Sequence, residues 1–134
     1  SGTVFISVKD GHKPAMAALG RDLLAMGYRL VATSGTAEHL RSEGLKVEEV
    51  KKVREGRPHI VDKMKSGEVQ MIFNTTEDKK AIADSFSLRR TALTNAIPYY
   101  TTVAGCRAVT QAIQAMRAGQ LEVAPLQAYF ERPF

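Results

Sequence analysis

The strongest constraint on the fold is a regular alternation between short strand-like runs and longer helix-like segments. The strand-like runs are rich in β-branched and apolar residues and cover 3–8, 28–32, 45–50, 69–73 and 97–101. Most of the segments between and after them have apolar residues at helical spacing, and the helix-like segments cover 15–26, 37–43, 59–65, 77–94 and 103–116. Such alternation is typical of parallel strands joined by right-handed crossovers. We therefore predict a three-layer α/β fold: a mostly parallel five-stranded sheet with helices on both faces.

Proline and the less regular stretches set the limits of these elements. Pro14 suits the first position of a helix, and Pro98 is compatible only with a strand start or an edge strand. Residues 51–58 form a basic segment with glycine and proline, which predicts a loop. Residues 120–134 show no clear period and are predicted to be a tail.

The size and composition of the chain favour one domain. Its 134 residues suffice for a single core, and its 44% hydrophobic and 25% charged residues are ordinary for a globular protein. No apolar run approaches the roughly 20 residues of a membrane span, and no signal pattern opens the chain, so we expect a cytoplasmic protein. The opening Ser1-Gly2 has the composition of a cloning remnant. We expect one domain over 1–134, taken from a longer chain.

A small, hydroxyl-rich stretch at 33–37 lies where the second strand turns into a helix. The first N–H groups of a helix lack partners within the helix and favour an anion, so this turn can hold a phosphate. The alternative is a simple helix cap, because Ser and Thr are common N-cap residues. Other predicted strands also end in hydroxyl or amide side chains: Ser7, Asn74, Thr75, Thr76, Thr101 and Thr102. In a parallel sheet these ends share one edge, which favours a phosphate site.

A phosphate site also needs a cation. Lys13 and Lys52 lie on loops at the expected ligand edge, whereas Lys9, Arg54 and the pair Arg89-Arg90 are further candidates. Each of them taken alone is better explained as a surface charge. The net charge of +5 suits an anionic ligand, but few aromatic residues and no tryptophan argue against a nucleic-acid surface.

The residues needed for catalysis are sparse. His12, His39 and His59 have no evident carboxylate or nucleophile partner, and there is no zinc-binding cluster, Walker A motif or Rossmann glycine fingerprint. The single cysteine, Cys106, is predicted to be a small buried helix residue. Many donors without an acid or base indicate binding rather than turnover.

Five runs of the sequence carry motifs that occur together in one family. They cover 6–13, 32–37, 53–60, 72–76 and 88–93, and the most specific is Glu-Gly-Arg-Pro-His-Ile at 55–60. In sequence and in order they resemble the C-terminal allosteric domain of the bacterial carbamoyl-phosphate synthetase large subunit. The resemblance implies a methylglyoxal-synthase-like fold in a domain without catalytic residues of its own. It further implies UMP as inhibitor, IMP at an overlapping site and ornithine as activator.

The resemblance also assigns roles to residues. The phosphate and ribose positions are Ser7, Lys13, Thr33, Thr36, Lys52, Asn74, Thr75 and Thr76. The positions that line the base are Val53, Ile60, Asp84 and Leu88, and those near ornithine are Tyr99 and Thr101. Tyr100 stands where the family carries an acidic residue, which weakens the ornithine assignment. The domain itself would need no cofactor or metal; the parent synthetase would use ATP and Mg, and its other domains and glutaminase small subunit would be the partners.

Enzymes of the same fold provide the alternatives. Methylglyoxal synthase shares the phosphate loop but has a Gly-Gly-Asp catalytic segment, whereas this chain has Glu-Gly-Arg-Pro-His in roughly that region. Without that carboxylate base, phosphate binding remains but proton abstraction does not. A phosphate-ester lyase of this type is the second hypothesis, and an inosinate cyclohydrolase ranks lower.

Overall fold

The computed structural model describes residues 2–50, 60–75 and 79–123, with the side chains of 79–86 and 119–123 excepted. Five strands form one all-parallel sheet in the order β3-β2-β1-β4-β5. They are β1 (Thr3–Ser7), β2 (Arg29–Ala32), β3 (Val47–Glu49), β4 (Met71–Asn74) and β5 (Tyr99–Tyr100). The predicted parallel five-stranded sheet is confirmed.

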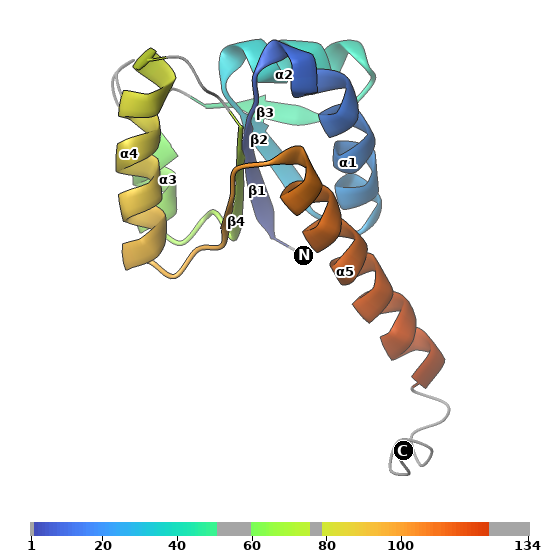
Figure 1. Cartoon of the computed structure of the whole chain (residues 1–134). Helices are drawn as coiled ribbons and strands as arrows, with labels where there is room; N and C mark the ends of the chain where they lie inside the picture. Colours follow the sequence, from blue (N-terminus) through green and yellow to red (C-terminus); the bar gives the residue numbers. More distant parts are fainter. Residues whose placement is uncertain (1, 51–59, 76–78, 124–134) are drawn as a thin grey trace.

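Helices cover both faces of this sheet (Figure 1). They are α1 (Lys13–Ala25), α2 (Ser34–Ser42), α3 (Ile60–Lys65), α4 (Lys79–Thr94) and α5 (Val103–Val123), and a 3-10 turn, η1 (Asp10–His12), precedes α1. Helices α1, α2 and α5 pack on one face, and α3 and α4 pack together on the other. The predicted three-layer arrangement is therefore confirmed.

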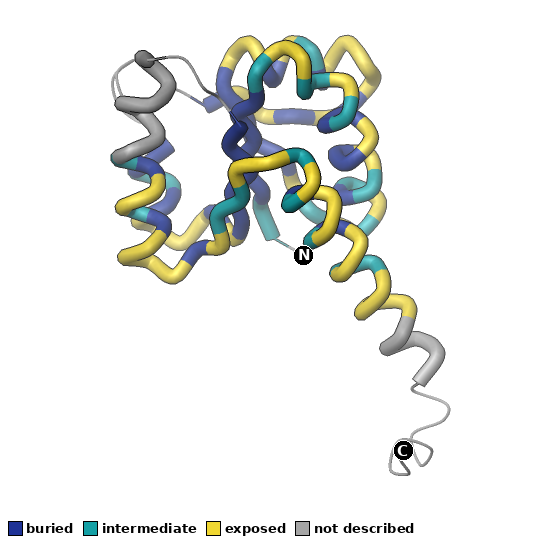
Figure 2. The backbone as a smooth tube through the Cα atoms, viewed as in Figure 1, coloured by how far each residue is buried: buried dark blue, intermediate teal, exposed yellow. Residues whose placement is uncertain are grey.

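Two hydrophobic cores result from the alternation of side chains along the central strand β1. Val4 and Ile6 belong to the core beneath α1, α2 and α5, whereas Phe5 belongs to the core beneath α3 and α4. All three are fully buried. Burial is continuous along β4 and most of β1 and β2 and alternates with exposure along α1 (Figure 2), as expected for central strands buried on both faces and for amphipathic helices. The edge strands β3 and β5 are only partly buried.

Several element boundaries differ from the prediction. The hydroxyl-rich residues after Thr33 form the first turn of α2 rather than a loop before it, because Ser, Gly and Thr are well tolerated at a helix start. Pro14 is the second residue of α1, where its missing N–H is equally harmless.

Helix α5 is longer than predicted and runs to Val123, past the body of the molecule (Figure 1). The predicted segment covered 103–116 and was expected to stop near Gly119, but the flanking Ala, Gln, Leu and Glu are strong helix formers, and one glycine costs only about 1 kcal/mol. Pro98 immediately precedes β5, which is an edge strand, as the sequence required. None of the helices, within the described residues, has the length and apolar character that crossing a membrane requires.

Candidate functional site

The candidate site lies at the carboxyl ends of β1, β2 and β4. From β1 the chain continues toward β2 and β3 on one side of the sheet, and β4 and β5 extend the other side. The gap between such diverging connections is where ligands bind in open α/β sheets. Five predicted phosphate-site residues meet around this edge and are between 2% and 6% exposed: Ser7, Thr33, Thr36, Asn74 and Thr75.

Hydrogen bonds tie the loops at this edge together. The Val8 N–H donates to Thr36 Oγ1 at 3.2 Å, which joins the end of β1 to α2. The Thr75 N–H donates to the Ser7 carbonyl at 2.9 Å, which joins β1 to the end of β4. Thr33 Oγ1 lies 3.4 Å from Ser7 Oγ, a long contact for two hydroxyl groups. The hydroxyls of Ser7 and Thr33 are therefore only weakly engaged with each other.

The first turn of α2 has free donor capacity. Thr33 occupies the N-cap position with an extended backbone, but its side chain makes no capping hydrogen bond. The first helical bond runs from the Ala37 N–H to the Thr33 carbonyl at 2.7 Å, so the helix offers no acceptor to the amides of Ser34, Gly35 and Thr36. The simple-cap alternative predicts a Thr33 side chain turned onto these amides. The Thr33 side chain makes no such bond, so within the described residues it does not cap these amides.

Lys13 supplies the cation at this turn. A Cβ added to Gly35 would lie 3.5 Å from Lys13 Nζ, so the ammonium sits directly over the first turn of α2. Its side chain is only 15% exposed, whereas its partner Asp10, at 2.6 Å, is 96% exposed. The hydrogen bond from Lys13, and then the Lys13 charge, lower the pKa of Asp10. An incoming anion can therefore replace a solvated carboxylate beside a mostly buried lysine.

His12 is a member of this site that sequence reasoning left without a partner. Its Nδ1 lies 2.9 Å from Thr75 Oγ1, although the two residues are 63 positions apart. The signal in the sequence was its position in the loop after the first strand, at the same sheet edge as Thr75. No pattern of spacing pairs the two residues.

Tyr99 extends the site toward β5. Asn74 Nδ2 donates to Tyr99 Oη at 2.7 Å, and the Arg89 guanidinium lies 5.1 Å from the centre of the Tyr99 ring. Tyr100 points to the other face, where its ring packs edge-on against Phe73. Of the two adjacent tyrosines, Tyr99 is therefore the one connected to the hydroxyl cluster. Thr101, the second residue predicted near ornithine, follows β5 and is exposed.

Two further predicted site residues lie away from this cluster in the part of the chain that the structure describes. Ile60 and Leu88 are buried in the core between the sheet, α3 and α4. Asp84 is on α4, but its side chain is outside the described residues, as are Lys52, Val53 and Thr76 altogether. Their roles stay predictions.

Metal-binding and nucleophilic groups do not add to the site in the described ranges. No group of three His, Cys, Asp or Glu side chains there could hold a metal ion. Cys106 is fully buried near the start of α5, and burial raises its pKa to about 12. The thiol is therefore protonated at neutral pH, and the predicted role as a buried helix residue is confirmed.

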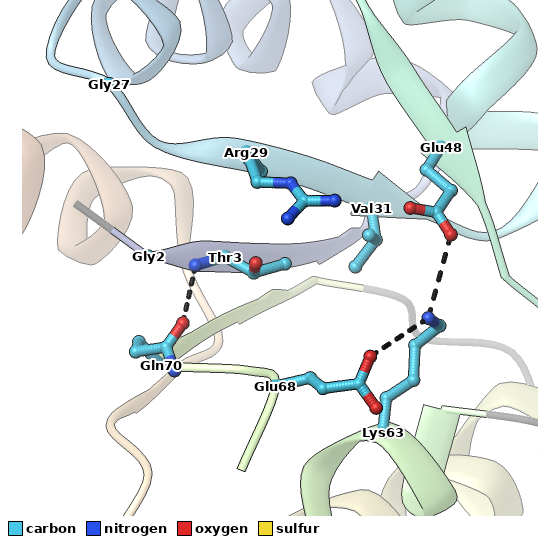
Figure 3. Close-up of a pocket in the computed structure, with 9 residues that line it drawn as sticks. All are labelled: Gly2, Thr3, Gly27, Arg29, Val31, Glu48, Lys63, Glu68 and Gln70. Atoms are coloured by element: carbon cyan, nitrogen blue, oxygen red, sulfur yellow. Dashed lines mark hydrogen bonds and ion pairs between the residues drawn. The ribbon is translucent and has the colours of Figure 1, made fainter. Parts of the chain in front are cut away.

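A hollow of about 350 Å³ lies away from this site, beside the amino ends of β1 and β2 (Figure 3). Lys63 bridges Glu48 at 3.6 Å and Glu68 at 3.5 Å across it, and Gln70 Oε1 accepts the Thr3 N–H. Lys63, Glu48 and Glu68, three of the four charged side chains that line it, pair with one another, and the hollow lies at the opposite edge of the sheet from Ser7, Thr33 and Thr75. The site at the carboxyl edge, called the cradle from here on, is therefore the better candidate for an anionic ligand. It consists of Ser7, Lys13, Thr33, the first turn of α2, Asn74 and Thr75.

Comparison with known proteins identifies relatives. A family model described as "MGS-like domain" matches residues 15–101. The carbamoyl phosphate synthase large chain of Myxococcus xanthus is 51% identical over 96% of this chain, and that of Mesorhizobium japonicum is 48% identical over 97%. The chain spans only 12% and 11% of the length of these two relatives.

A solved structure shares the fold at lower identity. The structure titled "Crystal structure of ForH" has a TM-score of 0.65, with 17% identity over 86% of this chain and 79% of that chain. This likeness concerns the fold alone. The family model covers well over half of the chain, and its match includes Thr33, α2, Asn74 and Thr75 of the candidate site, whereas Ser7 and Lys13 precede it. The chain therefore belongs to the MGS-like domain family.

Proposed function

We propose that this chain is the allosteric nucleotide-binding domain of a cytoplasmic carbamoyl phosphate synthetase large chain and holds the phosphate of UMP or IMP in the cradle. The observation that carries the proposal is the uncapped first turn of α2 with the Lys13 ammonium over Gly35. Backbone amides at a helix start together with a cation form a suitable site for a phosphate monoester. The similarity to synthetase large chains over nearly the whole sequence supports this parent enzyme.

The domain would act by regulation rather than chemistry. UMP and ornithine would each favour a different arrangement of the parent enzyme, because a ligand with equal affinity for both arrangements shifts neither. The link from Asn74 through Tyr99 to Arg89 supports an ornithine-responsive region next to the cradle. The other large-chain domains and the glutaminase small subunit would be the partners, and ATP with Mg would serve the parent's catalytic domains.

Isothermal titration of the chain with UMP, and with uridine as the control without phosphate, tests the proposal. We expect UMP to bind and uridine to bind much more weakly or not at all. Equal binding of the two would contradict a phosphate-anchored site. Absence of UMP binding would remove the cradle as the nucleotide site of this chain.

A methylglyoxal-synthase-type lyase is the second candidate, because Asp10 places a carboxylate next to Lys13 at the cradle. The depressed pKa of Asp10 makes it a weak base, which argues against this role. Assays with dihydroxyacetone phosphate would decide between the two. Turnover that is lost in Asp10→Asn or Asp84→Asn would establish the lyase and overturn the regulatory proposal.

A further inference from the structure

The contact between His12 and Thr75 couples a titratable ring to the proposed anion site. His12 ends the turn after β1, Thr75 follows β4, and Nδ1 and Oγ1 are 2.9 Å apart. Thr75 is buried among the hydroxyls of the cradle, and His12 is half-buried. The contact therefore connects the two sides of the gap in which the phosphate is proposed to bind.

The hydroxyl of Thr75 has only one hydrogen, which restricts the state of the ring. If neutral His12 carries its proton on Nε2, then Nδ1 is an acceptor and takes the Thr75 hydrogen. The hydroxyl can donate to a phosphate oxygen only when Nδ1 itself carries a hydrogen and donates to Oγ1. The imidazolium satisfies this condition without a choice of tautomer, because both of its nitrogens are donors.

The charged groups near His12 influence whether its imidazole takes up a proton when an anion binds. The connection that carries His12 also carries Lys9, Asp10 and Lys13. His39 of α2 is close enough to Asp10 to influence its pKa. The His39 Nε2 is enclosed and has no hydrogen-bond partner in the described part of the chain. A bound phosphate adds negative charge here, which favours protonation of a nearby imidazole.

We propose that His12 is a positioning residue of the anion site, which turns the Thr75 hydroxyl hydrogen toward the phosphate and takes up a proton when the phosphate binds. The proton comes from solvent and returns to it when the ligand leaves, and no bond of the ligand is broken. The proposal rests on the proposed function and adds a pH response to it. Nucleotide affinity rises as the pH falls through the range in which histidine titrates.

Titration of UMP into the native chain and into His12→Asn at about pH 6 and about pH 8 tests this, since histidine titrates between these values. The phosphate of UMP also titrates near pH 6, but it does so equally for both proteins. We expect the ratio of the UMP affinity of the native chain to that of His12→Asn to be higher at the lower pH. The ratio can change by at most about tenfold per pH unit, which is the limit for one proton. Calorimetry in two buffers of different ionisation enthalpy measures the proton uptake directly.

Two further variants separate the roles. His12→Asn can still donate a hydrogen bond to Thr75, whereas His12→Ala cannot, so at about pH 8 the Asn variant should bind UMP more tightly than the Ala variant. His39→Asn should keep the native pH dependence. Equal pH profiles of the native chain and His12→Asn, with UMP bound by both, would overturn the inference alone. Absence of UMP binding to the native chain at either pH would overturn the proposed function and the inference together.

Discussion

Replacing Gly35 with alanine tests whether glycine is required at this position by the fold or by a bound ligand. Gly35 is the second residue of α2 and has a helical backbone. Among the described residues, the one nearby atom that an added Cβ would meet is Lys13 Nζ at 3.5 Å, an ordinary van der Waals contact. The protein itself therefore has room for the methyl group, which would stand where the proposed phosphate approaches the backbone amides.

The expected effects on stability and on binding have opposite directions. An alanine that fits the native backbone without strain stabilises a protein by about 0.4–1 kcal/mol, because the unfolded chain loses freedom. For a chain of this size, that raises the melting temperature by roughly 2–5 °C. UMP affinity should fall by at least about tenfold, about 1.4 kcal/mol, because the ligand phosphate can no longer contact the amides at close range.

Thermal unfolding and UMP titration of the same sample provide the test. Gly11→Ala is the matched control, because Gly11 lies in the neighbouring turn and its added Cβ would meet no atom within 4 Å. This control should leave UMP affinity unchanged. Unchanged UMP affinity in Gly35→Ala would refute close approach of the phosphate to α2. A lower melting temperature would refute the claim that the fold has room for a methyl group at position 35.

Three further predictions follow from the same contacts. Thr36→Val should destabilise the fold by about 1–3 kcal/mol, measured by urea unfolding, because the buried Val8 N–H loses its acceptor, whereas Thr36→Ser should retain most of the stability. Asp10→Asn should tighten UMP binding at low salt, because Lys13 loses a competing carboxylate; weaker binding would show that Asp10 assists the ligand. Cys106 has a pKa raised to about 12, so only about one thiol in ten thousand is ionised at pH 8, and Ellman's reagent should label it only in denaturant; rapid labelling of the native chain would contradict its burial.

The fold was predictable because its signals are local. Apolar runs such as 3–8 and helical spacing such as that in 15–26 are properties of neighbouring residues, and the parallel sheet follows from their alternation. The order of the strands was not predicted, because it depends on the side of the sheet to which each crossover connection adds the next strand. The start of α2 was placed too late because Ser34-Gly35-Thr36 has the composition of both a loop and a helix start.

The candidate site was predictable in part for a topological reason. Ser7 and Asn74 end parallel strands and Thr33 directly follows one, so their meeting at one edge follows from the fold class. The contact between His12 and Thr75 depends instead on the shapes of two loops that are 63 residues apart. Likewise, the composition around Thr33 suits a helix cap, and only the structure shows that its side chain makes no capping bond.

The two peptide groups at the end of β1 give the site a mechanical property. The Ser7 carbonyl holds the chain after β4, and the next N–H, that of Val8, holds the first turn of α2. Both walls of the cradle are thus fixed to neighbouring points of the central strand, which is paired on both sides. A ligand that displaces either wall must strain this shared anchor, so movement on one half of the sheet is transmitted to the other half within two residues.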